Sequence, residues 1–145
     1  VLLHVPDNIE KDIMESISNI PQVRSTLDAI EEIDLLIFGI GNASDMARRR
    51  KSSDEECEVI NKRGAVSEAF GHYFNINGEI VYETSTVGIK LDKYKALNDI
   101  IGIAGGKKKA EAILSIARIN RNLVLITDES AANYLMEITG GFDDN

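Results

Sequence analysis

The chain contains four short apolar runs that are continuous rather than alternating, at residues 1–5, 34–40, 99–104 and 122–127. A strand with one solvated face alternates apolar and polar residues, whereas a strand of a parallel sheet is covered on both faces and is apolar throughout. The four runs therefore predict buried strands of a parallel sheet.

Helical segments lie between these runs. Apolar residues recur at helical spacing over residues 9–20, 23–33, 110–117 and 131–136. This spacing places the apolar side chains on one stripe of each helix, where they can pack against a sheet. The alternation of strands and helices predicts an α/β fold, with a parallel sheet and flanking helices.

The middle of the chain departs from this alternation of strands and helices. Asn77-Gly78 separates two strand-like runs within residues 72–82. Asn-Gly is favoured in tight hairpin turns because both central residues adopt positive φ. The sequence thus predicts a β-hairpin inserted into the α/β frame.

Two of the predicted strands end in glycine turns. Gly39 and Gly41 follow the second run, while Gly105 and Gly106 follow the third and precede Lys107-Lys108-Lys109. A cation in the first turn of a helix costs about 0.3–1 kcal/mol unless an anion lies there. Ligands of open α/β sheets bind outside the carboxyl ends of strands. We interpret the turns as a phosphate site; the alternatives are a solvated helix start and a plain tight turn.

Three further groups are candidates for chemistry. Arg48-Arg49-Arg50 follow the first glycine turn, and at most one or two of three consecutive side chains can face one ligand. Glu68, a lone acid in an apolar run, can orient a polyol or be a helix-surface acid. Asp128 and Glu129 follow the fourth run, where a helix cap is favoured over an active-site base.

Composition excludes several classes of function. The net charge of −8 argues against nucleic-acid binding by this segment alone, while basic clusters at 48–51 and 107–109 suit a small anion. Cys57 has no Cys or His nearby, and neither His4 nor His72 has a spaced partner, so no disulfide or metal site is expected. With no run of 18 apolar residues and no signal peptide, we expect a soluble, cytoplasmic protein without a membrane span.

Four blocks, at residues 38–41, 63–71, 103–113 and 125–132, resemble in order and spacing the sugar-binding domain of the SorC family of bacterial transcriptional regulators. The resemblance implies a Rossmann-like fold akin to sugar-phosphate isomerases, turned from catalysis to sensing. It implies that Arg49 and Lys109 hold phosphate oxygens and that Glu68 meets sugar hydroxyls. No cofactor is implied.

The resemblance also implies a biological role. We expect the effector-binding domain of a repressor of glycolytic genes, sensing a phosphorylated sugar such as fructose-1,6-bisphosphate. Effector binding would change the contacts of a homo-oligomer, a dimer or tetramer, and thereby its affinity for operator DNA. Residues 1–145 would be the C-terminal part of one effector domain, truncated at the N-terminus and without the DNA-binding domain, so ligand binding by the chain alone is expected to be weak or absent.

Two other hypotheses remain at this stage. One is an enzyme of the sugar-phosphate isomerase type, with Glu68 or Asp128 as the proton-transfer base. The other is an oligomerisation module. We favour the regulator because the acidic residues do not form a clear catalytic pair in the sequence.

Overall fold

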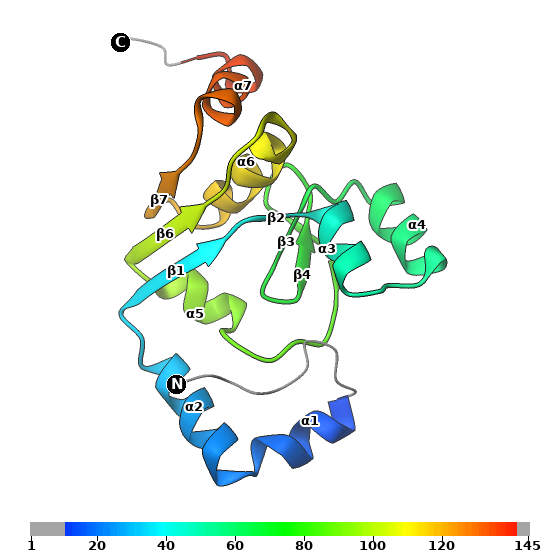
Figure 1. Cartoon of the computed structure of the whole chain (residues 1–145), viewed down its shortest axis with the longest axis vertical. Coiled ribbons are helices and arrows are strands. Elements are labelled where there is room, and N and C mark those ends of the chain that lie inside the picture. The colour runs from blue at the N-terminus through cyan, green and yellow to red at the C-terminus, as the bar shows by residue number, and fades with distance from the viewer. Residues whose placement is uncertain (1–10, 142–145) are drawn as a thin grey trace.

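The computed structural model describes residues 11–141, which form two β-sheets and the helices around them (Figure 1). The first sheet is parallel and contains β1 (Leu35–Gly39), β6 (Asp99–Ile103) and β7 (Leu123–Ile126), in the order β1-β6-β7. Three of the four predicted strands and their parallel pairing are thereby confirmed, but their predicted burial on both faces is wrong for residues 11–141, because β1 and β7 alternate between half-buried and exposed residues. The fourth, at residues 1–5, lies outside the described residues.

The second sheet is antiparallel and has the order β2-β3-β4-β5. Its strands are β2 (Gly41–Asn42), β3 (Ser67–Ala69), β4 (His72–Phe74) and β5 (Ile80–Glu83). The predicted hairpin is confirmed as β4-β5, and Gly78 in its turn has φ of 80°. The hairpin is part of a larger sheet. The sequence did not predict the other two strands, because β2 and β3 are too short to show an alternating pattern.

Seven α-helices lie within the described part of the chain. They are α1 (Lys11–Ser18), α2 (Pro21–Glu31), α3 (Ala43–Arg49), α4 (Asp54–Lys62), α5 (Leu91–Ala96), α6 (Ala110–Ile119) and α7 (Glu129–Thr139). A 3₁₀ turn, η1 (Lys107–Lys109), precedes α6. The stripes predicted from the sequence correspond to α1, α2, α6 and α7, whereas α4 and α5 were not predicted. From residue 11 to residue 141, no helix has the length and apolar character needed to cross a membrane.

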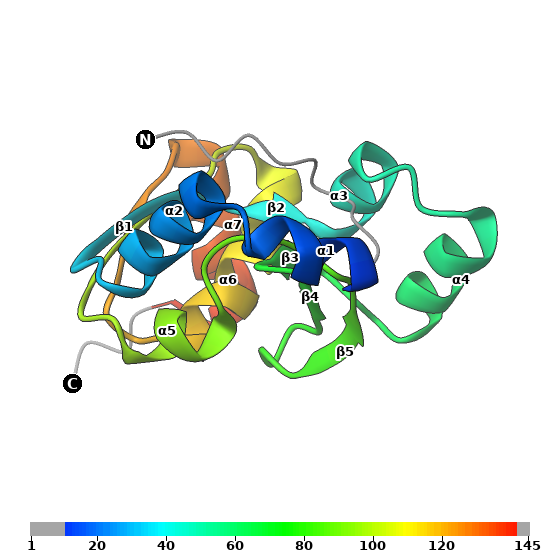
Figure 2. The same ribbon diagram turned by 90° about the horizontal axis from the view of Figure 1, so that it is seen from below.

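The main core lies between α5, α6 and one face of the parallel sheet, and Figure 2 shows both helices on the same side of the strands. Tyr94 of α5 and Ile116 of α6 are fully buried beside Ile100 of β6. Burial raises the pKa of Tyr94 to about 12. A second cluster, formed by Ala43, Ala47, Ile60 and Tyr73, packs α3 and α4 against the antiparallel sheet.

Ile40 joins the two sheets, because it is the single residue between β1 and β2. It is fully buried, and its amide donates to the Ile103 carbonyl at 3.1 Å, which extends the pairing of β1 with β6. The chain then enters the antiparallel sheet at Gly41, which pairs with Glu68. This seam brings α3 and η1 to the carboxyl ends of β1 and β6.

Candidate anion-binding site

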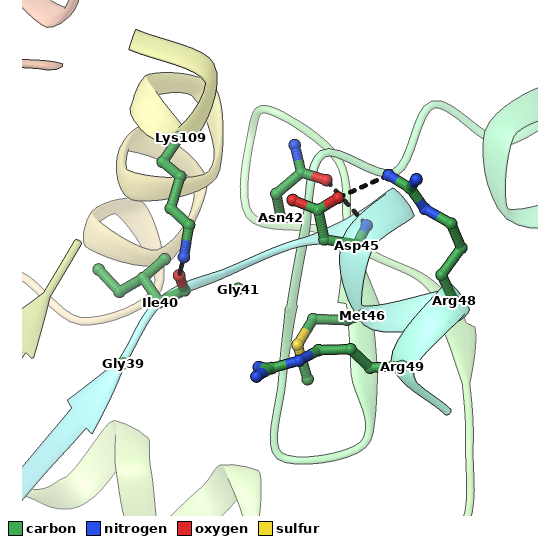
Figure 3. A pocket seen from close by; sticks show the side chains of 9 residues that line it. All are labelled: Gly39, Ile40, Gly41, Asn42, Asp45, Met46, Arg48, Arg49 and Lys109. Carbon is green, nitrogen blue, oxygen red and sulfur yellow. Dashed lines mark hydrogen bonds and ion pairs between the residues drawn. The ribbon is translucent and has the colours of Figure 1, made fainter. Parts of the chain in front are cut away.

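A pocket of 640 Å³ opens at the seam between the two sheets (Figure 3). The glycine turn that follows β1, helix α3 and turn η1 all contribute residues to it. The lining residues are Gly39, Ile40, Gly41, Asn42, Asp45, Met46, Arg48, Arg49 and Lys109. The pocket therefore lies where ligands of α/β sheets bind, outside the carboxyl ends of parallel strands.

The absence of a side chain at Gly41 lets the Met46 side chain of α3 pack closely against the backbone of β2. A Cβ atom there would lie 2.6 Å from Cγ of Met46 and 3.3 Å from the backbone oxygen of Glu68. Asn42 fixes the start of α3, because its side chain accepts a hydrogen bond from the Asp45 amide at 3.2 Å. Its amide nitrogen lies 3.5 Å from the Lys108 carbonyl and so links α3 to η1.

The three consecutive arginines do not all face the pocket, in agreement with the prediction that at most one or two of them could contact one ligand. Arg48 is exposed and forms an ion pair with Asp45 at 2.7 Å. Arg49 extends along the pocket toward the side where Ile40 lies (Figure 3), and within residues 11–141 its guanidinium forms no ion pair. Arg50 turns inward to the Glu68 carboxylate at 2.8 Å. One arginine is thus presented to a ligand without a carboxylate partner.

The three lysines also separate. Lys109 enters the pocket, where its Nζ donates to the Ile40 carbonyl at 2.8 Å (Figure 3). An ammonium group has three donors, so this contact leaves it able to donate to an anion. Lys107 lies over the Tyr134 ring with its Nζ 4.4 Å from the centroid, and Lys108 is exposed. Neither lines the pocket.

The glycine turn before η1 differs from the phosphate cradle that the sequence suggested. The Gly106 amide donates to Oδ2 of Asp128 at 2.7 Å, so a carboxylate of the chain itself occupies this backbone donor. Asp128 also caps α7 by accepting from the Ala131 amide at 2.9 Å, which confirms the helix-cap prediction. Hydrogen bonds from Ala131, Ser130 and Gly106 lower the pKa of Asp128.

Glu68 lies one strand behind the pocket and does not line it. Because it belongs to β3 and is only 3% exposed, the alternative prediction of a helix-surface acid is wrong. Its Oε1 accepts from Arg50 at 2.8 Å and from the Gly71 amide at 3.1 Å. Burial, together with the nearby Glu68 carboxylate, raises the pKa of Tyr73 to about 12.

The residues in and around the pocket suit an anion better than a cation. Over residues 11–141 no group of three His, Cys, Asp or Glu side chains could hold a metal ion. Three cationic side chains, Arg48, Arg49 and Lys109, line the pocket with one acid, Asp45, which pairs with Arg48. Fold and site together define an α/β domain with a pocket, lined by cationic side chains, at the carboxyl ends of its strands.

The chain belongs to the sugar-binding domain family of SorC-type transcriptional regulators, whose family profile matches residues 1–137. It is 44% identical over 135 residues to the central glycolytic genes regulator of Bacillus subtilis (strain 168). That match covers 93% of this chain and 40% of the Bacillus protein, so the chain spans less than half the length of this curated relative, and the same holds for the regulator of the same name from Priestia megaterium.

Solved structures agree with the assignment. A SorC family transcriptional regulator from Enterococcus faecalis is 34% identical with a TM-score of 0.84, and the match covers 92% of this chain and 55% of that chain. The sugar-binding domain of a transcriptional repressor from Vibrio fischeri has a TM-score of 0.78 at 17% identity, covering 96% and 58% respectively. The second likeness supports the fold alone.

These relatives confirm the predicted family and fold class, and they argue against the isomerase hypothesis. The matching proteins bear the names of transcriptional regulators. In the structure, Glu68 is held in a buried ion pair and Asp128 caps a helix, so neither carboxylate is presented as a free base.

Proposed function

We propose that this chain is the effector-binding part of a bacterial repressor of glycolytic genes and that its effector is a phosphorylated sugar, with fructose-1,6-bisphosphate as the expected ligand. The observation that carries this proposal is the convergence of Arg49 and Lys109 on one pocket. An arginine fork suits bidentate contact with phosphate oxygens, while a lysine acts as a point charge. The relative from Bacillus subtilis bears the name of a glycolytic gene regulator, which supports the same class of ligand.

Lys109 and Arg49 come from different parts of the fold. Lys109 belongs to the turn after β6, while Arg49 ends α3, which follows β2. A phosphate held by both would connect the parallel sheet to the helix that packs on the antiparallel sheet. This is how we propose that an effector changes the arrangement of the domain.

Glu68 is the third proposed contact, for sugar hydroxyls. Its backbone pairs with that of Gly41, which lines the pocket. Because its carboxylate is buried and bonded to Arg50, a sugar hydroxyl that reaches it would join that hydrogen-bond network. Charged acceptors of this kind form the stronger class of hydrogen bond.

The regulator as a whole would bind operator DNA through a separate domain and act as a homo-oligomer. An effector needs to favour one assembly state by about 1–3 kcal/mol to switch DNA affinity. A pocket at the junction of two sheets is suited to this role, since it contacts both.

A thermal-shift screen tests the proposal. We would screen the 145-residue chain, and a chimaera that carries it in place of the matching part of the Bacillus subtilis regulator. The ligands are fructose-1,6-bisphosphate, hexose monophosphates, pentose phosphates and inorganic phosphate. A ligand present at about 100 times its Kd stabilises the folded state by about 2.7 kcal/mol. A shift selective for a phosphorylated sugar supports the proposal, and no shift with any of them in the chimaera refutes it.

Matched variants test the residues. Lys109→Ala and Arg49→Ala each remove a charge-assisted contact worth about 1.5–3 kcal/mol, so affinity should fall about 10- to 150-fold. Lys108→Ala removes the same charge outside the pocket and is the control. Isothermal titration calorimetry gives the affinities; equal effects of Lys109→Ala and Lys108→Ala would contradict the assignment.

A further inference from the structure

The two carboxylate oxygens of Asp128 have different partners. Oδ1 caps α7, because it accepts from the Ala131 amide and from the Ser130 hydroxyl, both at 2.9 Å. Oδ2 accepts from the Gly106 amide at 2.7 Å. A helix cap requires only the contacts of Oδ1. The Asp128–Gly106 bond is therefore an additional contact, which connects the end of β7 to the turn after β6.

Both glycines of this turn are adapted to the Asp128–Gly106 bond. A Cβ atom at Gly105 would lie 2.6 Å from Oδ2 of Asp128, so a side chain there would displace the carboxylate. Gly106 has φ of 92°, which glycine adopts without the steric cost that other residues have. The glycine pair thus serves a contact within the chain.

The same turn determines where the Lys109 side chain begins. The Gly106 carbonyl accepts from the Lys109 amide at 2.9 Å, which closes the 3₁₀ turn η1. Asp128 therefore binds the amide of Gly106, while Lys109 binds its carbonyl. From this turn the Lys109 side chain enters the pocket and donates to the Ile40 carbonyl at 2.8 Å (Figure 3). A fixed turn limits the positions that this long side chain can reach.

Helix α7 contacts the turn at a second point. The Nζ atom of Lys107 lies 4.4 Å from the centroid of the Tyr134 ring, and a cation over an aromatic face is attracted to it. Tyr134 belongs to α7, and Asp128 is the cap of the same helix. One end of η1 is thus held against α7, while Lys109 at its other end enters the pocket.

We propose that Asp128 is a positioning residue, which fixes the glycine turn so that Lys109 is already directed into the pocket before an anion binds. A side chain that is ordered in advance loses less entropy on binding, so the affinity is higher. Asp128 is exposed, and Asn is as good a helix cap as Asp. Asp128→Asn should therefore act on the site more than on the stability of the fold.

Acetylation of lysine amines tests the positioning without any ligand. In the chimaera with the Bacillus subtilis regulator, limiting acetic anhydride and tandem mass spectrometry give the rates at Lys109 and, as the internal reference, at Lys108. We expect Lys109 to react about 5-fold or more slowly than Lys108, because its amine is partly buried and hydrogen-bonded. Asp128→Asn should at least halve this difference. The Asn oxygen keeps the two donors of the cap, and the amide nitrogen then facing Gly106 cannot accept a hydrogen bond.

Two further variants separate the Asp128–Gly106 bond from the helix cap. Gly105→Ala crowds Oδ2 without changing a charge, and φ of Gly105 is not positive, so alanine itself is not strained there. It should have the same effect as Asp128→Asn. Ser130→Ala removes a contact of Oδ1 only and should leave the ratio of rates unchanged. With folding checked by circular dichroism, the proposal is overturned if both disruptive variants leave the ratio unchanged, or if Ser130→Ala alters it equally.

A double-mutant cycle extends the test to the ligand, and this part rests on the proposed function. The probe is fructose-1,6-bisphosphate, titrated into the chimaera by calorimetry. Asp128→Asn should weaken binding about 2- to 10-fold, within the range of couplings between contacting residues. It should have no effect in a Lys109→Ala background, and an equal loss in both backgrounds would contradict the proposal. If Lys109→Ala itself leaves binding unchanged, the proposed function fails, while the acetylation rates still decide whether Asp128 positions Lys109.

Discussion

The ion pair between Arg50 and Glu68 should be among the most sensitive points of the fold. The Arg50 side chain is 12% exposed and the Glu68 side chain 2% exposed, and their closest charged atoms are 2.8 Å apart. Arg50→Met keeps most of the side-chain volume but leaves the carboxylate buried without its cation. Removing one partner of a buried pair costs about 3–5 kcal/mol. For a domain of this size that corresponds to a fall in melting temperature of roughly 10 °C or more.

The same helix offers a matched control. Arg48 pairs with Asp45 at 2.7 Å, but the two side chains are 75% and 57% exposed. An exposed pair contributes about 0–1 kcal/mol, because water screens it and ordering two long side chains costs entropy. Arg48→Met should therefore change stability by less than about 1 kcal/mol. Both pairs have nearly the same distance, so burial alone separates the two expectations.

Urea unfolding followed by circular dichroism measures the difference. The double variant Arg50→Met, Glu68→Leu should be more stable than Arg50→Met, because it removes the uncompensated charge as well. If Arg50→Met is no more destabilising than Arg48→Met, or if the double variant is the least stable of the three, the reasoning from burial is refuted.

Three other predictions concern different parts of the fold. Gly71 and Gly64 both have positive φ, where an alanine costs about 1–2 kcal/mol. At Gly71 the added Cβ would also lie 2.8 Å from the backbone oxygen of Thr84, whereas at Gly64 nothing lies within 4 Å. Gly71→Ala should therefore destabilise the fold more than Gly64→Ala in urea unfolding, and equal effects would contradict the clash. Ser115 donates to the Asn75 carbonyl in the hairpin at 2.7 Å and lies 2.8 Å from the Ser67 hydroxyl; Ser115→Ala should cost about 1–3 kcal/mol and more than Ser67→Ala, since it removes two hydrogen bonds where Ser67→Ala removes one, and equal costs in urea unfolding would contradict this. The Asp128 carboxyl has a lowered pKa, so its contribution to stability is present above the unfolded pKa near about 4 and is lost as pH falls below it; an NMR titration midpoint at or above that value would contradict this.

The parallel strands could be predicted because their runs are apolar throughout, although one face of the sheet is exposed within residues 11–141. The antiparallel sheet was harder: β3 spans three residues and β2 two, which is too short for a period to show. Helix α4 did leave a readable signal, since Ser53 and Glu56 form a reciprocal capping box at its start. Its acidic first turn, Asp54 to Glu56, agrees with the same signal.

The candidate site could be predicted in its residue types but not in its geometry. Charge alone could not separate Lys109 from its two neighbours, because the direction of each side chain depends on the 3₁₀ turn in which they lie. The inward turn of Arg50 depends on Glu68, a partner 18 residues away that only the folded sheet brings near. The hydrogen bond that occupies the Gly106 amide likewise depends on Asp128, which follows a different strand, β7.

The single residue between the two sheets has a mechanical consequence. Ile40 connects the two sheets without a linker, since its amide is hydrogen-bonded to β6 while the next residue already belongs to β2. A movement of one sheet relative to the other therefore requires a change of the backbone angles at Ile40 or Gly41. An anion that bridges Lys109 and Arg49 would act as a brace across this joint, and its loss should be seen in native-state hydrogen exchange as two sheets that open separately rather than as one cooperative unit.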